Sequence, residues 1–315
     1  MKMLFLPLLL LSSWCSSPSA HLSNSFASVP VVPARSVGQP GAGTTPVSAA
    51  MAYDFTRPAA SYSMPSELME LSGITLSGAN QITGIEDETG NLYHYNLTTK
   101  RVDQVVPFGD NGDYEDVARV GSDWFILRSN GTLFRYDGTN TQEYETGLTF
   151  ANEPEGLTYD AASKTLLVAC KGEPGADLPD TKRAVYRLQP STYKAEAKPA
   201  YVLDVETIVA SVPYKEVIVK KEGKKGKKKE GLKGFAPSAV AVHPVTQHVF
   251  VLSARQNGIV ELNASGKLLA AQSLPADLFP QPEGLAFTST GDLYIATEAG
   301  KKSGQATIHL FRAQQ

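Results

Sequence analysis

Short apolar runs, separated by turn residues, recur from residue 61 to the end of the chain. In the clearest unit, residues 281–299, an acid beside a glycine precedes two apolar runs that a Gly-Asp turn joins. Related units begin at residues 70, 113, 153 and 236, and the equivalent positions are Gly73, Asp116, Gly156, Ala239 and Gly284. The steps between these positions are 43, 40, 83 and 45 residues. A period near 40 residues, built from short strands, predicts an all-β β-propeller with one four-stranded blade per repeat.

The 83-residue step leaves the blade number open between five and six. It holds either one blade with a long insert or two blades, one of them degenerate, and residues 201–205 and 216–219 are candidate strands for either. We favour five blades and keep six as the alternative. The fifth repeat stops after its third strand, and an open ring would leave backbone groups unpaired. Residues 61–68 are therefore expected to supply the missing outer strand and to close the ring.

The N-terminal region predicts export. Residues 1–14 contain one lysine followed by an apolar run that is too short to span a bilayer and is typical of a secretory signal. Cleavage after Ala20 is one interpretation. The other is a bacterial lipobox at residues 11–15, with Cys15 lipidated and attaching the chain to a membrane, although Trp14 departs from that pattern. A retained anchor helix is a third. We expect a periplasmic protein, an outer-membrane lipoprotein or a secreted protein.

Composition divides the chain into three parts and isolates one basic segment. Residues 1–20 are the signal, residues 21–60 read as a disordered tether rich in Ser, Pro and Ala, and residues 61–315 form the propeller. The net charge is -3, but residues 215–233 alone hold nine lysines and three glutamates. Its lysine run, residues 223–231 (GKKGKKKEG), is interpreted as a solvated loop. It has no interleaved aromatic residues for stacking, so no nucleic-acid partner is expected. The two cysteines, Cys15 and Cys170, exclude a disulfide framework, and Cys170 is expected in a buried strand.

The candidate site follows from the position of charged residues within the repeats. Innermost strands of a propeller line a channel, and ligands gather at its end. The starts of the innermost strands carry Ser72, Glu115, Asp116, Glu155, Ser238 and Glu283. A second ring carries Glu86, Asp87, Arg128, Lys171, Arg255 and Glu298. Crowded carboxylates must pair with cations or raise their pKa values, and calcium suits oxygen ligands.

The predicted metal ligands are Glu86, Glu115, Asp116, Glu155, Glu283 and Glu298. The alternative is purely structural: each acid accepts backbone N–H bonds or pairs with Arg128, Lys171 or Arg255. No zinc motif, nucleophile elbow or phosphate-binding loop is present in the sequence, so catalytic residues are not assigned.

Several motifs resemble one family. They are residues 70–74 (ELSGI), 113–118 (DYEDVA), 153–157 (EPEGL), 281–287 (QPEGLAF) and 291–296 (GDLYIA). Together they resemble the SdiA-regulated family of exported bacterial propellers, which is distantly akin to NHL-repeat proteins. The resemblance implies a calcium-associated propeller outside the cytoplasm and assigns no reaction. Residues 236–240 (APSAV) depart from the pattern because they lack the acid, and the lysine-rich insert has no counterpart in it.

Three functions are compatible with the sequence. The first is an exported binding or scaffold propeller, expected to be monomeric, that takes a calcium ion, a small ligand or an envelope protein at the acidic funnel. The second is a calcium-dependent hydrolase (an esterase, lactonase or phytase-like phosphatase) with Glu115, Glu155 or Glu283 as base. The third is an electrostatic adhesin that uses the lysine-rich insert. Geometry separates a hydrolase from a purely structural ring of acids. Hydrolysis predicts three or more carboxylates around one point, whereas a structural role predicts that each carboxylate pairs with Arg or Lys.

Overall fold

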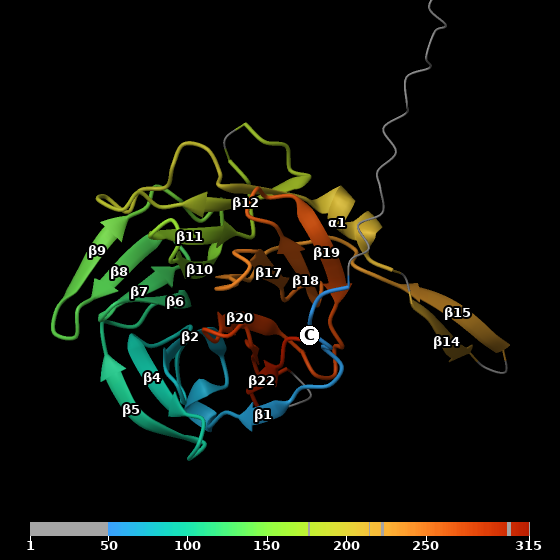
Figure 1. Ribbon diagram of the computed structural model, residues 1–315, viewed down its shortest axis with the longest axis horizontal. Helices are drawn as coiled ribbons and strands as arrows, with labels where there is room; N and C mark the ends of the chain where they lie inside the picture. Colours follow the sequence, from blue (N-terminus) through green and yellow to red (C-terminus); the bar gives the residue numbers. More distant parts are fainter. Residues whose placement is uncertain (1–49, 176, 214, 222–223, 301–303, 315) are drawn as a thin grey trace, which may run out of the picture. The chain divides into compact units, whose positions relative to one another are not determined.

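The chain folds as a ring of five four-stranded antiparallel sheets (Figure 1). The computed structural model describes residues 50–175, 177–213, 215–221, 224–300 and 304–314. The predicted signal, Cys15 and residues 21–49 of the predicted tether lie outside the described residues. Across the described residues, no helix has the length and apolar character needed to cross a membrane. The prediction of a five-bladed propeller is confirmed.

Each blade runs from the channel outward through four strands. In blade 1 these are β2 (Leu71–Gly78), β3 (Gln81–Glu86), β4 (Asn91–Asn96) and β5 (Arg101–Pro107), and in blade 2 they are β6 (Tyr114–Val120), β7 (Asp123–Arg128), β8 (Thr132–Tyr136) and β9 (Thr141–Glu145). In blade 3 they are β10 (Pro154–Asp160), β11 (Thr165–Cys170), β12 (Lys182–Arg187) and β13 (Tyr201–Asp204), and in blade 4 they are β16 (Ala239–Val242), β17 (Val249–Ser253), β18 (Gly258–Leu262) and β19 (Leu268–Ser273). In blade 5 they are β20 (Pro282–Phe287), β21 (Leu293–Thr297), β22 (Thr307–Phe311) and β1 (Ala60–Ser63).

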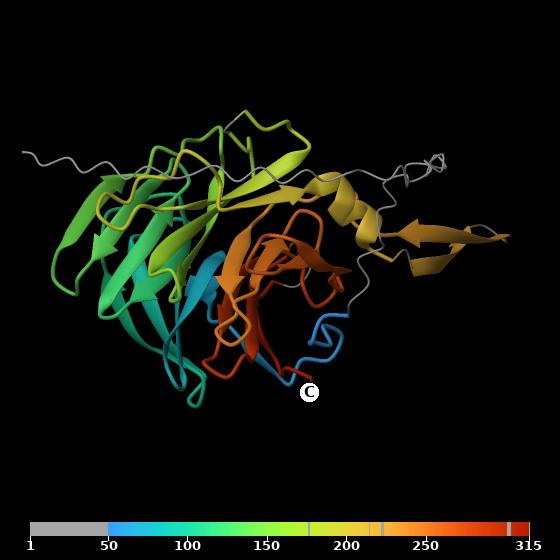
Figure 2. The same cartoon turned by 45° about the horizontal axis from the view of Figure 1, so that its top comes forward.

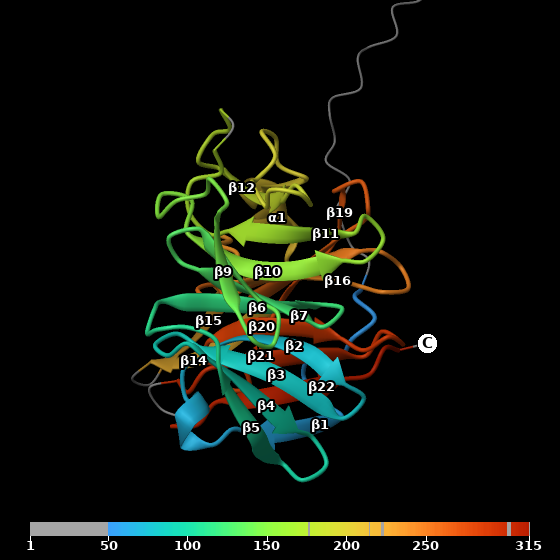
Figure 3. The same ribbon diagram turned by 90° about the vertical axis from the view of Figure 1, so that its left-hand side faces the viewer.

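The two ends of the propeller share blade 5. Strand β1 pairs antiparallel with β22, with Ala60 opposite Leu310 and Ser63 opposite Thr307 (Figure 3). The expected closure by the N-terminal segment is thus confirmed, and a 3-10 helix (η1, Ser66–Leu68) leads from β1 into blade 1. The folded region starts earlier than the predicted tether boundary at residue 60. Met51, Tyr53 and Phe55 are buried because they pack with blades 4 and 5.

Five apolar clusters hold the ring, one between each pair of neighbouring blades. Because successive strand residues face opposite sides of a sheet, each blade presents an apolar layer to both neighbours. Ile85 and Val117 belong to the cluster between blades 1 and 2, and Leu167 and Val251 to the one between blades 3 and 4. The core therefore sits between blades, so the inner edges of the innermost strands are left to line the channel.

The 83-residue step contains one blade followed by an insert. Residues 201–204 form the outer strand of blade 3, and helix α1 (Val205–Ser211) follows, capped by the Asp204 side chain, which accepts a hydrogen bond from the Thr207 amide. The lysine-rich segment then forms a two-stranded hairpin of β14 (Lys215–Lys221) and β15 (Lys224–Glu230). A solvated loop was predicted here, and the backbone is instead paired across seven register positions.

Candidate functional site: the acidic end of the channel

The glycines that mark the repeats are required by close packing around the channel. A Cβ atom on Gly156 would lie 2.8 Å from the carbonyl carbon of Ala239 in blade 4. A Cβ atom on Gly284 would lie 2.9 Å from a side-chain carbon of Ile74 in blade 1. Neither approach leaves room for a side chain. These positions are equivalent in the ring, and the repeat alignment made from the sequence is correct for them.

In four of the five blades, a β-bulge occurs next to the repeat position that Gly156 and Gly284 occupy. In blade 2, Tyr114 pairs with Arg128 and Asp116 with Leu127, so Glu115 is the extra residue. The register skips the equivalent residues in the other three blades, which are Ser72, Glu155 and Glu283. A bulge bends the strand and re-aims the side chain of its extra residue. The bulges therefore explain why residues next to core positions can face the channel end.

Glu115, Glu155, Glu283, Glu298 and Lys171 define what we call the acidic end of the channel. They lie where the innermost strands begin and the second strands finish. Lys171 follows β11 and its Nζ lies 2.5 Å from Oε1 of Glu155, whose side chain is only 13% exposed. The predicted pairing of a ring acid with Lys171 is therefore present in the structure. Burial nevertheless outweighs this ion pair and raises the pKa of Glu155 to about 7.

Glu115 is the acid at this end with the least compensation. Burial, followed by the charges of Glu155, Asp113 and Glu283, raises the pKa of Glu115 to about 9, and Lys171 only partly opposes these effects. Among the described residues, no donor forms a hydrogen bond with its carboxyl group. A carboxylate that is crowded by like charges and has no donor must hold a proton or take up a cation. The uncompensated charge of the site is therefore centred on Glu115.

Blades 5 and 1 supply a second group of acids. Glu298 follows β21, and burial, a hydrogen bond with Glu283 and the charge of Glu283 raise its pKa well above the usual range. The Gln281 amide nitrogen donates to both Glu283 (3.1 Å) and Glu298. Burial and the neighbouring Glu70 raise the pKa of Asp87 to about 6. The sequence pattern did not point to Gln281, whose neutral side chain holds these two acids together.

Two predicted metal ligands have structural partners instead. Oδ1 of Asp116 accepts a hydrogen bond from the Val117 amide (2.8 Å), and Oδ2 accepts one from the Leu157 amide of blade 3 (2.7 Å). Glu86 accepts from the backbone of the turn that follows β3, at the amides of Glu88 (3.0 Å) and Thr89 (2.7 Å). Asp116 thus accepts hydrogen bonds from backbone amides at the junction of blades 2 and 3, and Glu86 accepts them from amides in a turn. Both carboxylates supply acceptors that these amides would otherwise lack.

Ser238, like Asp116, joins two neighbouring blades through hydrogen bonds to the backbone, but its side chain is neutral. Its hydroxyl group donates to the Pro282 carbonyl of blade 5 (3.0 Å) and accepts a hydrogen bond from the Ala254 amide (3.0 Å). The position without an acid in blade 4 is thus another junction between neighbouring blades. Within the described part of the chain, Arg128 and Arg255 form no ion pair with the ring acids, so of the three cations expected there only Lys171 does.

The arrangement does not form a ready metal site. Among the described residues, no three His, Cys, Asp or Glu side chains are grouped so that they could hold one metal ion. Glu155 already binds the Lys171 ammonium, and Glu283 and Glu298 share a hydrogen bond. A calcium ion needs six to eight oxygen ligands around one point. The donors present do not fit such an ion in this arrangement.

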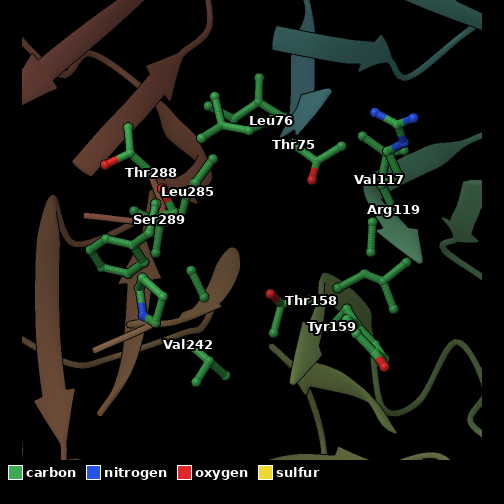
Figure 4. A pocket seen from close by; sticks show the side chains of 17 residues that line it. Thr75, Leu76, Val117, Arg119, Thr158, Tyr159, Val242, Leu285, Thr288 and Ser289 are labelled. Atoms are coloured by element: carbon green, nitrogen blue, oxygen red, sulfur yellow. The ribbon is translucent and has the colours of Figure 1, made fainter. Parts of the chain in front are cut away.

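The opposite end of the channel has no acidic side chain in its lining and holds a cavity of about 190 Å³ (Figure 4). It is lined by the ends of all five innermost strands, and the hydroxyl groups of Thr75 and Thr158 face into it. Arg119 lines the same end, and its guanidinium carbon lies 5.1 Å from the centre of the Trp124 ring. None of the six predicted metal ligands lines this cavity, so the channel has two chemically different ends.

Comparison with known proteins supports the fold and the family resemblance. Residues 189–300 match the SdiA-regulated family. Glutaminyl cyclase from Myxococcus xanthus is similar in structure, with a TM-score of 0.53 and 14% identity over 81% of this chain and 95% of that one. Regucalcin from Agrobacterium tumefaciens, a calcium-binding protein, has a TM-score of 0.49 and 13% identity over 81% and 95% of the two chains. The likeness to the glutaminyl cyclase, at 14% identity, indicates a shared fold alone. No curated protein matches the sequence.

Proposed function

We propose that this five-bladed propeller of the SdiA-regulated type is a binding protein that takes up a small cation at the acidic end of its channel. The observation that carries the proposal is Glu115, a half-buried carboxyl group with no hydrogen-bond donor among the described residues and a pKa of about 9. A cation that replaces its proton would be attracted by Glu115, Glu155 and Glu283 together. Such a site binds a positive charge without any change in the backbone.

A primary ammonium group fits this end better than calcium does. The Lys171 ammonium already lies 2.5 Å from Glu155, and its pKa is raised by Glu155, Glu283 and Glu115 despite burial. An ammonium group needs only two or three acceptors, whereas calcium needs more than the described residues bring to one point. We therefore propose an ammonium ligand first. Calcium, which the family resemblance implies, is the second ligand to test.

The test is titration calorimetry on the full chain with 1,4-diaminobutane and, separately, with calcium chloride. We expect saturable binding of the diamine that strengthens between pH 6 and pH 9, because the pKa values of Glu155 and Glu115 are raised to about 7 and about 9 and bound protons must leave. Glu115→Gln should weaken binding at least tenfold. Glu143→Gln, an exposed acid on β9, is the matched control and should leave binding unchanged.

Equal affinities of the wild type and Glu115→Gln would place the ligand elsewhere. Calcium binding that is stronger than diamine binding and is lost in Glu115→Gln would reverse our choice of ligand and keep the site. Hydrolysis is the weaker candidate because the described residues do not group three carboxylates around one point; its support is a Glu155 pKa of about 7, which suits a general base. Turnover of an ester, lactone or phosphoester panel that disappears in Glu155→Gln would establish it.

Export is proposed from the N-terminal sequence and is tested separately. Mass spectrometry of the chain isolated from a bacterial envelope separates cleavage after Ala20 from lipidation of Cys15. Cys15→Ser should release a lipidated chain from the membrane fraction and should have no effect on a chain that is cleaved after Ala20. Sedimentation of the mature chain tests the expected monomer.

A further inference from the structure

The lysine-rich hairpin is a structural addition to the propeller. It lies between the last strand of blade 3 and the first strand of blade 4, and it extends away from the ring (Figures 1 and 2). Strands β14 and β15 pair with each other and, among the described residues, belong to no larger sheet. An isolated two-stranded hairpin is marginally stable in water, and both of its edges are open. The hairpin therefore adds little to the stability of the propeller, and we looked for a binding role for it.

Charge is unevenly distributed along the hairpin. At its base, the register pairs opposite charges, with Lys215 opposite Glu230 and Glu216 opposite Lys229. Toward the tip it pairs like charges: the pairs are Lys220 with Lys225 and Lys221 with Lys224. Like charges directly opposite each other destabilise an antiparallel pair. An anionic partner at the tip would remove this repulsion, so the charge pattern favours the bound state over the free one.

Apolar positions lie between the charged base and the charged tip. Val217, Ile218 and Val219 are consecutive, so their positions alternate between the two faces of the hairpin. Val217 and Ile218 are opposite Lys228 and Lys227 in the register. A soluble polyanion would bind the lysines but would not bury the three apolar residues. The boundary between lipid headgroups and acyl chains accommodates both kinds of residue.

The rest of the chain would be repelled by an anionic surface. Outside residues 215–233 the sequence holds 20 basic and 29 acidic residues. An attraction to anionic lipids must therefore come from the hairpin. Each lysine near such a surface contributes about fivefold in affinity at physiological salt. The four tip lysines together would thus contribute a few hundredfold.

We propose that the β14–β15 hairpin binds the surface of a membrane that contains anionic lipids. The inference is independent of cation binding at the acidic end of the channel. If the N-terminus is lipidated at Cys15, the hairpin adds an electrostatic contact with the bilayer to that anchor. If the signal is cleaved, the hairpin supplies a reversible attachment that salt weakens.

The test is vesicle co-sedimentation of the full chain. Vesicles of phosphatidylcholine with 30% phosphatidylglycerol are compared with vesicles of phosphatidylcholine alone. The hairpin variant is Lys220→Gln, Lys221→Gln, Lys224→Gln and Lys225→Gln. The control variant removes the same number of lysines from the propeller: Lys164→Gln, Lys194→Gln, Lys198→Gln and Lys267→Gln. These four are exposed, and both variants lower the net charge equally.

We expect the hairpin variant to lose at least a hundredfold in affinity for the anionic vesicles and the control variant to keep most of its affinity. Binding to phosphatidylcholine vesicles reports any contribution of the N-terminal segment and should be the same for all three chains. Equal binding of the hairpin variant and the wild type to anionic vesicles would overturn the proposal. Thermal unfolding of each variant verifies that the propeller is intact.

A further variant separates a membrane from a soluble polyanion. Val217→Thr, Ile218→Thr and Val219→Thr keeps β-branched residues and the lysines while it removes the apolar surface. We expect it to bind anionic vesicles more than tenfold more weakly and dextran sulfate as tightly as the wild type does. Unchanged vesicle binding by this variant would overturn the membrane proposal in favour of a polyanionic polymer. Glu115→Gln should leave all these affinities unchanged.

Discussion

Replacement of Glu115 by glutamine should stabilise the propeller while it removes the proposed ligand site. Glutamine keeps the size of the protonated acid and carries no charge at any pH. Glu115 has a folded-state pKa of about 9 against an ordinary value of 4.5, because burial and neighbouring acids disfavour its charge. The folded protein therefore binds a proton on Glu115 that the unfolded chain has released at neutral pH. Folding stability must fall as pH rises from 4.5 to 9.

The magnitude follows from the two pKa values. Each unit of pKa difference corresponds to about 1.4 kcal/mol, so the interval from 4.5 to pH 8 corresponds to at most about 5 kcal/mol. Glu115 is partly exposed to solvent, which screens its charge, so we expect Glu115→Gln to raise the free energy of unfolding by about 1–2 kcal/mol at pH 8. At pH 4.5 the difference should shrink to a few tenths of a kcal/mol, because the acid is neutral in the folded state and about half neutral in the unfolded state.

Urea denaturation of the wild type and Glu115→Gln at pH 4.5, 7 and 8.5 measures this difference. The midpoint of the variant should move to higher urea with increasing pH, with an unchanged slope. Thermal melting at pH 8 should show a rise in Tm of about 2–8 °C for this gain. Glu143→Gln is the control for removal of one negative charge. A variant that is no more stable than the wild type at pH 8.5 would refute the interpretation that Glu115 is a strained, uncompensated acid.

Three further predictions concern the packing of the ring. Gly156→Ala should lower the free energy of unfolding, measured in urea, by about 1–3 kcal/mol because the new Cβ atom would meet the Ala239 backbone. Gly78→Ala is the control and should change it little, because its Cβ atom would lie 3.5 Å from the Gln81 Cβ atom. Asp116→Ala should cost about 2–4 kcal/mol in the same assay because two buried amides lose their acceptor, and a cost below 1 kcal/mol would contradict that role. The Cys170 thiol, buried and with a pKa raised to about 12, should react with a thiol reagent only after unfolding; rapid labelling of the native chain would disprove its burial.

The ring architecture could be predicted because each repeat carries its own constraint. The glycines at positions 156 and 284 recur because a neighbouring blade leaves no room for a Cβ atom there: the Ala239 backbone is too close to Gly156 and the Ile74 side chain is too close to Gly284. Closure by residues 60–63 could be predicted from the missing fourth strand of the last repeat. The buried residues Met51, Tyr53 and Phe55 were missed because three apolar residues at alternating positions are too short a pattern to distinguish from a tether.

The position of the site could be predicted, and so could one of its ion pairs, between Glu155 and Lys171, but not the partners of the other acids. The sequence placed acids at the start of the innermost strands, and the structure puts Glu115, Glu155 and Glu283 at one end of the channel. It could not separate Glu115 from Asp116, because the bulge that turns one toward the channel and the other into a blade junction depends on register. A strand was expected at residues 216–219, but its partner at residues 224–230 was missed because lysine and glycine have low strand propensity, which cross-strand pairing outweighs here.

Closure of the ring through β1 and β22 has a consequence for how the protein is made. The strand that completes the last blade is synthesised among the first and can be used only after residues 307–311 have left the ribosome. Its contacts span some 250 residues, and closing a loop of that length costs on the order of 5 kcal/mol of chain entropy. The nascent chain thus remains an open array of blades until β22 has been made. A circular permutant with β1 joined after β22 would turn this last step into a local hairpin, and it should fold faster than the natural chain.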